Sequence, residues 1–326
     1  MFQLGEVRGL FHRMKEDGDG CREKKRSGLS AWGLVSALAF VTSLVSVAGL
    51  AGRSWWVLDV SSSFRFQFFV VLLILGAALA AGGKYRQSLG CLGLAALNLA
   101  FVLPCWLDAG RIVETPGSVR LKGLLVNVHT ANTRHEEVRQ LVEQVDPDVA
   151  VFEEVDVSWV HGLAGLLVRY PHNVFCTRPD NFGIGLVSRR PFRKTDLAQL
   201  GMAGVPSVYV ELDLGEGRTL HVVGTHPLPP VDAEYWALRN DQLDCVAQYV
   251  ARLKGPVLLL GDLNTPPWSP FFRQFTRQSG LRDCSRGRGL NTTWPTFFGL
   301  MRIPIDHAMV SPGVVVLSER VGPGIG

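Results

Sequence analysis

A carboxylate and a carboxamide at the end of an apolar run are the strongest chemical feature of this sequence. Residues 256–267 read Pro-Val-Leu-Leu-Leu-Gly-Asp-Leu-Asn-Thr-Pro-Pro, which places Asp262 and Asn264 directly after four apolar residues. Side chains two residues apart in an extended segment point to the same face. Such a pair suits a site that orients a water molecule and holds a phosphate oxygen. A strand followed by an Asx-type turn explains the same residues equally well.

Four further polar side chains stand at the ends of other expected strands, and they favour the chemical interpretation. They are Asn127, Glu154, His226 and Asp306. Each alone also fits a plain role as a turn residue or a solvated strand end. Together they place polar groups at the ends of five strands, which is how a site forms on one rim of a sheet sandwich. Oxygen ligands without cysteine suit Mg²⁺ or Mn²⁺ rather than zinc.

The elements that would position these residues begin near residue 119, where strand-like and helix-like patterns alternate. Helices are expected at residues 136–145 and 234–253 because their apolar residues recur at helical spacing. Strands are expected at residues 121–128, 149–152, 184–188, 207–214, 219–224 and 257–260, with a late strand entered at Asp306. This order predicts a layered α/β enzyme domain over residues 119–326.

The N-terminal third has a different composition. The chain is 47% hydrophobic and 19% charged, and the apolar excess is concentrated in residues 27–52, 66–83 and 87–107, which contain no charged residue. A hydrocarbon core of about 30 Å requires roughly 20 helical residues. The first stretch is too long, and its preceding tail too extended, for a signal peptide. Buried core helices are the alternative for the other two. We expect three transmembrane helices within residues 27–107.

The distribution of basic residues predicts the orientation of these helices. Residues 1–26 end in a basic cluster, and Lys84 and Arg86 lie in the second loop, whereas the first loop carries only Arg53 and Arg65, the latter offset by Asp59 nearby. Basic residues favour the cytoplasmic side. We therefore expect a cytoplasmic tail, an integral membrane protein of the inner or plasma membrane, and an extracytoplasmic domain after a linker at residues 108–118.

Charge and cysteine content exclude some classes of function. From residue 108 to residue 326 there are 22 basic and 23 acidic residues, so this part has a net charge of −1. A protein that grips duplex DNA usually carries a basic face, and none is required here. The six cysteines have no metal-ligand spacing and imply no disulfide framework. No protein partner can be inferred.

The order of motifs resembles the endonuclease/exonuclease/phosphatase superfamily of magnesium-dependent phosphoesterases, which have a four-layered α/β sandwich. The helical segment ahead of the domain is similar to a membrane-anchored bacterial branch. The matching motifs are Val-Asn-Val (126–128), Pro-Asp-Val-Ala-Val-Phe-Glu-Glu-Val (147–155), Gly-Ile-Gly-Leu-Val-Ser-Arg (183–189), Gly-Thr-His-Pro (224–227), Gly-Asp-Leu-Asn (261–264) and Ile-Asp-His-Ala-Met-Val-Ser (305–311).

This resemblance implies a role for each candidate residue. Asn127 and Glu154 would help to hold the Mg²⁺ or Mn²⁺ ion, with Glu153 as the variable neighbour of Glu154. His226 would donate to a non-bridging phosphate oxygen. Asp262 would orient or deprotonate the attacking water, Asn264 would steady the phosphate, and Asp306 would orient a further histidine.

The family pattern closes with a Gly-Ser-Asp-His motif, and this sequence ends at Gly326 where that motif would begin. We therefore expect the 326-residue form to be truncated and nearly inactive. Asp306 and His307 are an alternative closing pair, but residues 308–311 read onward as a strand, so His307 more readily takes an aromatic position.

Three functions follow as expectations. The first is a membrane-anchored, metal-dependent phosphodiesterase or nuclease acting on a phosphoester substrate, either nucleic acid or a lipid headgroup at the bilayer. The second is a phospholipid or inositol-phosphate type phosphatase. The third is a non-catalytic membrane protein with a decayed site. Trp268 and residues 292–294 are expected at the substrate rim, where an aromatic ring either stacks on a base or packs in the core.

Overall fold

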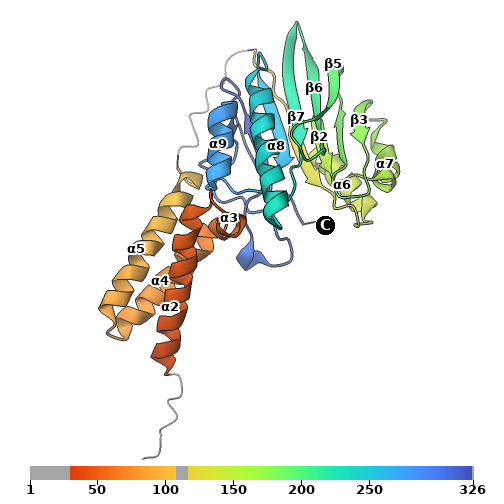
Figure 1. The fold of residues 1–326 in the computed structure, drawn as a ribbon. Coiled ribbons are helices and arrows are strands. Elements are labelled where there is room, and N and C mark those ends of the chain that lie inside the picture. The colour runs from red at the N-terminus through yellow and green to blue at the C-terminus, as the bar shows by residue number, and fades with distance from the viewer. Residues whose placement is uncertain (1–29, 108–116, 325–326) are drawn as a thin grey trace, which may run out of the picture.

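The computed structural model describes residues 30–107 and 117–324, which form a helical segment and an α/β domain. The basic cluster before residue 27 and most of the expected linker lie outside these residues. Figure 1 shows the helical segment extending from one end of the domain.

Two sheets form the centre of the α/β domain. The first has the order β1-β2-β4-β3, and the second has the order β5-β6-β7-β8-β10-β9. The strands of the first sheet are β1 (Gly123–Asn127), β2 (Val149–Glu153), β3 (His172–Cys176) and β4 (Ile184–Ser188). Those of the second are β5 (Phe192–Gln199), β6 (Pro206–Gly215), β7 (Arg218–Thr225), β8 (Val257–Asp262), β9 (Arg282–Asp283) and β10 (Asp306–Val310).

Three apolar clusters hold the domain in four layers. One fills the space between the sheets, where Val151 and Leu186 of the first sheet meet Val210 and Val222 of the second. Another packs the outer face of the first sheet against α6 (His135–Val145) and α7 (Val157–Leu163). The third packs the second sheet against α8 (Ala233–Ala251) and α9 (Pro270–Ser279). Buried on both faces, the inner strands consist of nearly continuous apolar runs.

The helical segment contains α2 (Ala31–Ala48), α3 (Trp56–Ser62), α4 (Arg65–Ala81) and α5 (Tyr85–Val102). Ala31–Ala51 and Tyr85–Cys105 are long and apolar enough to cross a membrane. The middle stretch forms a third span only if α3 and α4 are taken together, because they are bent by 66° at residues 63–64. The three expected spans are therefore two clear candidates and one bent pair.

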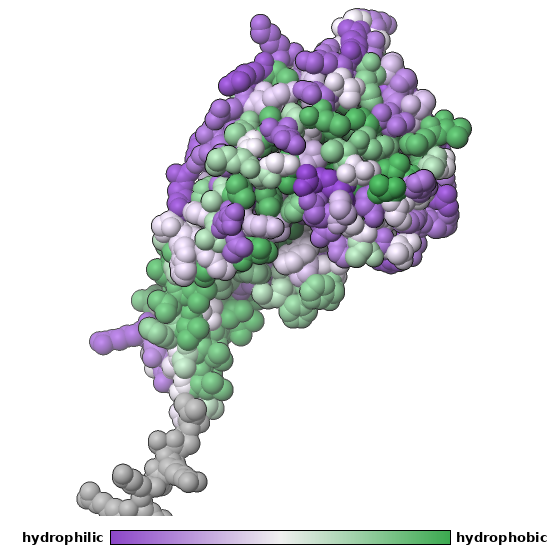
Figure 2. All heavy atoms as spheres, turned by 45° about the vertical axis from the view of Figure 1, so that its right-hand side comes forward, coloured by the Kyte–Doolittle hydropathy of each residue, from purple (hydrophilic) through white to green (hydrophobic). Residues whose placement is uncertain are grey.

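The exposed apolar surface of the helical segment is extensive. Leu38, Phe40 and Leu44 of α2 are at least half exposed, and only 17% of the most apolar window of this helix is buried. Figure 2 shows the corresponding hydrophobic surface below the more hydrophilic domain. Exposed apolar side chains in this number need a lipid or protein environment.

Arg65 and Asp59, whose charges offset each other in the count for the first loop, have different partners in the structure. The Arg65 guanidinium donates to the Ser46 carbonyl (2.9 Å) and to Asn98 Oδ1 (3.2 Å). Asp59 forms a buried ion pair with Arg239 of the α/β domain.

Candidate active site

The topology brings the predicted polar residues to one edge of the sandwich. Strands β1 and β2 run parallel, as do β7 and β8, so their carboxyl ends share a direction within each sheet. Strand β10 runs antiparallel to β8, and its first residue, Asp306, is in register with Asp262 at the end of β8.

Asn127 and Glu154 form the first part of this edge. The Asn127 amide donates to Glu154 Oε1 at 2.9 Å. The Glu154 backbone adopts a left-handed conformation (φ 62°), and its carbonyl accepts a hydrogen bond from the Thr130 hydroxyl at 2.9 Å. An uncommon backbone conformation at a non-glycine residue is typical of a constrained site. It places two oxygen-bearing side chains together.

Asp262 lies at the centre of the edge and is held by its own backbone contacts. Its N–H donates to both carboxylate oxygens of Glu153 at 3.1 Å, and its Oδ1 accepts from the Asn264 N–H at 2.9 Å. Burial, followed by the Asp306 charge, raises the pKa of Asp262 well above its usual value. Burial and the Asp262 and Asp306 charges do the same to Glu153, which is fully buried.

His226 and Asn264 border Asp262 on the adjoining loops. His226 Nε2 lies 3.9 Å from Asp262 Oδ2, and its Nδ1 is buried without a hydrogen-bond partner among the described residues. Burial lowers the pKa of His226 to about 4, so its imidazole is neutral near pH 7. Asn264 also has a left-handed backbone (φ 51°), and its side-chain amide donates to the Pro227 carbonyl at 2.9 Å.

His307 does not reach this edge. Alternate residues of a strand point to opposite faces, so His307 and Asp306 diverge. The His307 ring bonds to Asp283 Oδ2 (3.0 Å) and to the Thr265 carbonyl (2.9 Å), and it packs against Phe272. Burial opposes protonation of His307, but Asp283 outweighs it and raises the His307 pKa. The geometry therefore favours a structural role for His307 rather than the alternative closing pair.

A family model described as the Endonuclease/Exonuclease/phosphatase family matches residues 124–326, which include all of the candidate site residues. The chain belongs to this family. The family and the α/β sandwich predicted from the motifs are therefore confirmed. No curated protein matches the chain.

Several solved structures have a similar fold. D. rerio TDP2, complexed with a single-strand DNA product, has a TM-score of 0.50 and 17% identity, covering 59% of this chain and 83% of that chain. A β-hairpin deletion mutant of Staphylococcus aureus beta toxin has a TM-score of 0.49 and 18% identity, covering 64% and 95%. Sphingomyelinase C from Streptomyces griseocarneus has a TM-score of 0.47 and 18% identity, covering 60% and 85%. At these identities the likeness shows the fold alone.

The donor set of the site fits a hard divalent cation. Among the described residues, no three histidine, cysteine or carboxylate side chains converge in metal-binding geometry. Mg²⁺, however, usually takes one or two protein carboxylates and completes its shell with waters and substrate phosphate. Glu154 and Asn127 offer such a pair of oxygen donors, and the mutual repulsion of Asp262 and Asp306 is the kind that a nearby cation relieves.

Three features near the site were not predicted or were left open by the sequence. Glu153, which the resemblance gives only as the variable neighbour of Glu154, accepts the Asp262 N–H. Trp268, left open between base stacking and core packing, is buried and donates to the Ser62 carbonyl of α3 at 3.1 Å. Trp294 is 52% exposed, and Thr293 beside it accepts the Asp306 N–H at 3.3 Å.

The burial of His226 predicts a pH dependence of stability. A folded-state pKa near 4, below the unfolded value of about 6.5, means that the unfolded chain binds the proton first. His226 therefore favours folding above pH 6.5, and this contribution, at most about 3 kcal/mol, is lost as the pH falls toward 4. The Tm of the wild type and of His226→Gln would be measured from pH 7.5 to pH 4. The Tm of the variant should fall less steeply as the pH is lowered. Parallel curves would contradict this prediction.

Proposed function

We propose that this protein is a membrane-anchored, metal-dependent phosphoester hydrolase. The convergence of Asp262, Asp306 and His226 with the Asn127–Glu154 pair at one edge of the sandwich carries the proposal. Phosphoester cleavage needs charge stabilisation and in-line positioning more than covalent chemistry. A divalent ion, when bound, would supply Lewis-acid stabilisation of the phosphate charge.

Each side chain has a proposed task in this reaction. Glu154 and Asn127 would hold the Mg²⁺ or Mn²⁺ ion. Asp262 would orient or deprotonate the attacking water as a general base. The neutral His226 imidazole would donate one N–H to a non-bridging phosphate oxygen. Asn264 would steady the phosphate, and Asp306 would orient a further histidine.

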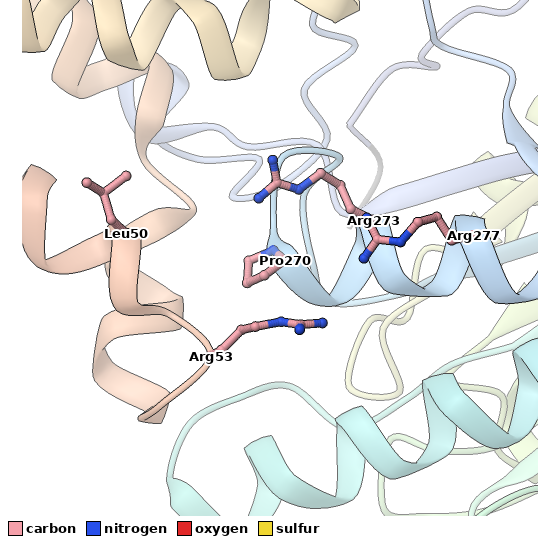
Figure 3. A pocket seen from close by; sticks show the side chains of 5 residues that line it. All are labelled: Leu50, Arg53, Pro270, Arg273 and Arg277. Atoms are coloured by element: carbon pink, nitrogen blue, oxygen red, sulfur yellow. The ribbon is translucent and has the colours of Figure 1, made fainter.

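The helical segment supports the proposed anchor. A hollow of about 360 Å³ at the junction of the segment and the domain is lined by Arg53, Arg273 and Arg277, next to Leu50 near the end of the first candidate span. Figure 3 shows these three side chains around the hollow. Among the described residues none of them forms an ion pair with an acid. Three arginine side chains near the end of a candidate span are suited to contact the phosphate groups of lipids.

The proposed topology has a direct test. With a cytoplasmic basic tail and Lys84 in the tight turn between α4 and α5, the positive-inside rule places the α/β domain outside the cytoplasm. A reporter that becomes active only outside the cytoplasm is expected to be active when it is fused after Gly326. A second fusion at Lys84 should show the opposite behaviour. A C-terminal fusion that works solely in the cytoplasm would overturn the topology.

Lipid headgroups are a second candidate substrate class, favoured by one exposed loop. Phe297 and Leu300 are 87% and 80% exposed. This loop, residues 294–302, is hydrogen-bonded to the start of α4. Gln67 Nε2 donates to the Leu300 carbonyl (3.3 Å) and to the Arg302 carbonyl (3.0 Å). The loop also begins next to Thr293, which bonds to the Asp306 backbone. An apolar loop between the spans and the site suits contact with a lipid surface.

A substrate panel separates these possibilities. The full chain in detergent or lipid nanodiscs would be incubated with a simple phosphodiester, single-stranded DNA and phospholipid headgroups, each with Mg²⁺ or with EDTA. Metal-dependent turnover of any of them supports the proposed reaction, and the preferred substrate defines its class. Failure on every substrate would favour a non-catalytic role.

A further inference from the structure

The short helix α3 of the helical segment contacts the domain beside the candidate site. Figure 1 shows it at the junction of the two parts, below α8 and α9. Its Asp59 side chain is 3% exposed, although it lies only eight residues after the first candidate span ends at Ala51. A charged side chain buried this deeply needs partners, because an isolated charge is costly to remove from water.

The partners of Asp59 all come from the α/β domain. Trp236 Nε1 and the Arg239 guanidinium, both on α8, donate to Asp59 Oδ2, the former at 3.1 Å. The Ser269 hydroxyl, which caps the start of α9, donates to Asp59 Oδ1 at 3.3 Å. These three donors come from two helices of the domain, so Asp59 joins the membrane segment to both of them.

Arg239 extends this contact to the active-site loop, which we define as residues 262–269. Its second terminal nitrogen donates to the Asn264 carbonyl at 2.8 Å. The backbone N–H of Asn264 donates to Asp262 Oδ1. A single guanidinium therefore links Asp59 to the residue that supports the proposed base. At the other end of the loop, Trp268 Nε1 donates to the carbonyls of Ser62 (3.1 Å) and Ser63 (3.2 Å).

The loop has a physical need for such support. Asn264 has a left-handed backbone, which costs free energy in a non-glycine residue and persists only when surrounding contacts fix it. Arg239 is 1% exposed, and it can bond to the Asn264 carbonyl as a charged group only if its charge is compensated. Asp59 is the carboxylate that compensates it.

We propose that Asp59 and Arg239 are positioning residues through which the membrane segment holds the active-site loop in its working conformation. This inference rests on the proposed function of the site. It gives the helical segment a role in catalysis in addition to membrane attachment. The two residues act on the reaction through Asn264 and Asp262 and do not contact the substrate.

Three variants of the full chain test this proposal. Arg239→Lys keeps the charge beside Asp59, but one ammonium group cannot replace both ends of the guanidinium fork. Asp59→Asn keeps an acceptor and removes the charge. Arg252→Lys is the matched control, because it makes the same change at an exposed arginine that follows the far end of α8. With a soluble phosphodiester, the first two should lower kcat about 10–100-fold per folded molecule and leave KM within about 2-fold.

Two further measurements separate positioning from stability. The double variant of Asp59→Asn and Arg239→Lys should be no slower than the slower single variant, because both act by one route. Deuterium exchange at the amides of residues 262–265 should rise in both single variants and stay unchanged in Arg252→Lys. Exchange needs no turnover, so it decides the inference even if the wild type hydrolyses nothing and the proposed function fails. A lower Tm with unchanged kcat and unchanged exchange would show that the two residues only stabilise the fold, and it would overturn the proposal.

Discussion

Asp262→Asn is expected to reduce turnover of a simple phosphodiester by about 10²–10⁴-fold, the range associated with loss of a general base. The change keeps the volume of the side chain and the acceptor for the Asn264 N–H, so the loop should keep its conformation. It also removes a buried carboxylate whose charged form is disfavoured by burial and by the Asp306 charge. Thermal stability should therefore be equal to or higher than that of the wild type.

The measurement is kcat together with Tm on the same preparations. Asp196→Asn is a matched control, because Asp196 is an exposed carboxylate on β5. It should change neither quantity. A variant of Asp262 that loses stability in proportion to its activity would indicate a structural carboxylate instead of a base.

The second large effect is expected from Glu154→Gln. If Glu154 binds the metal directly, loss of its charge should weaken Mg²⁺ binding and lower turnover at limiting Mg²⁺ by at least about 10–100-fold. The change retains the acceptor for the Asn127 amide, so the local structure should persist. Calorimetric titration of Mg²⁺ and the Mg²⁺ dependence of the rate would measure the two effects separately.

The adjacent Glu153 provides the control for this prediction. Glu153→Gln keeps the side-chain volume and an acceptor oxygen for the Asp262 N–H, and Glu153 is not proposed as a metal ligand. Glu153→Gln should therefore change Mg²⁺ affinity little, whereas Glu153→Ala would remove the support of the Asp262 N–H. Equal losses of Mg²⁺ affinity in Glu153→Gln and Glu154→Gln would mean that the wrong carboxylate was assigned to the metal.

The inner strands could be predicted from sequence because burial on both faces leaves a clear pattern. The strand expected at residues 184–188 coincides with β4, and all five of its residues are buried. Strand β5 was missed because six of its eight residues are exposed and its side chains are mostly polar. Helix α9 was missed, although Ser269 as N-cap and Pro270 at the first helical position are a recognisable start signal.

The contacts between the helical segment and the domain could not be predicted in this way. Asp59 and Arg239 are 180 residues apart in sequence, and no local pattern indicates that they meet. Trp268 illustrates the same limit, since stacking on a base and packing against α3 need the same aromatic residue.

The Mg²⁺ dependence of phosphodiester hydrolysis is the most direct test of the proposed metal-dependent reaction. The purified protein and its Asp262→Asn variant would be stripped with EDTA and assayed before and after Mg²⁺ is restored. Hydrolysis by the wild type should stop with EDTA and return with Mg²⁺, and the variant should stay near the rate without enzyme. Hydrolysis that persists in EDTA, or that Asp262→Asn carries out as fast as the wild type, would contradict the proposed reaction.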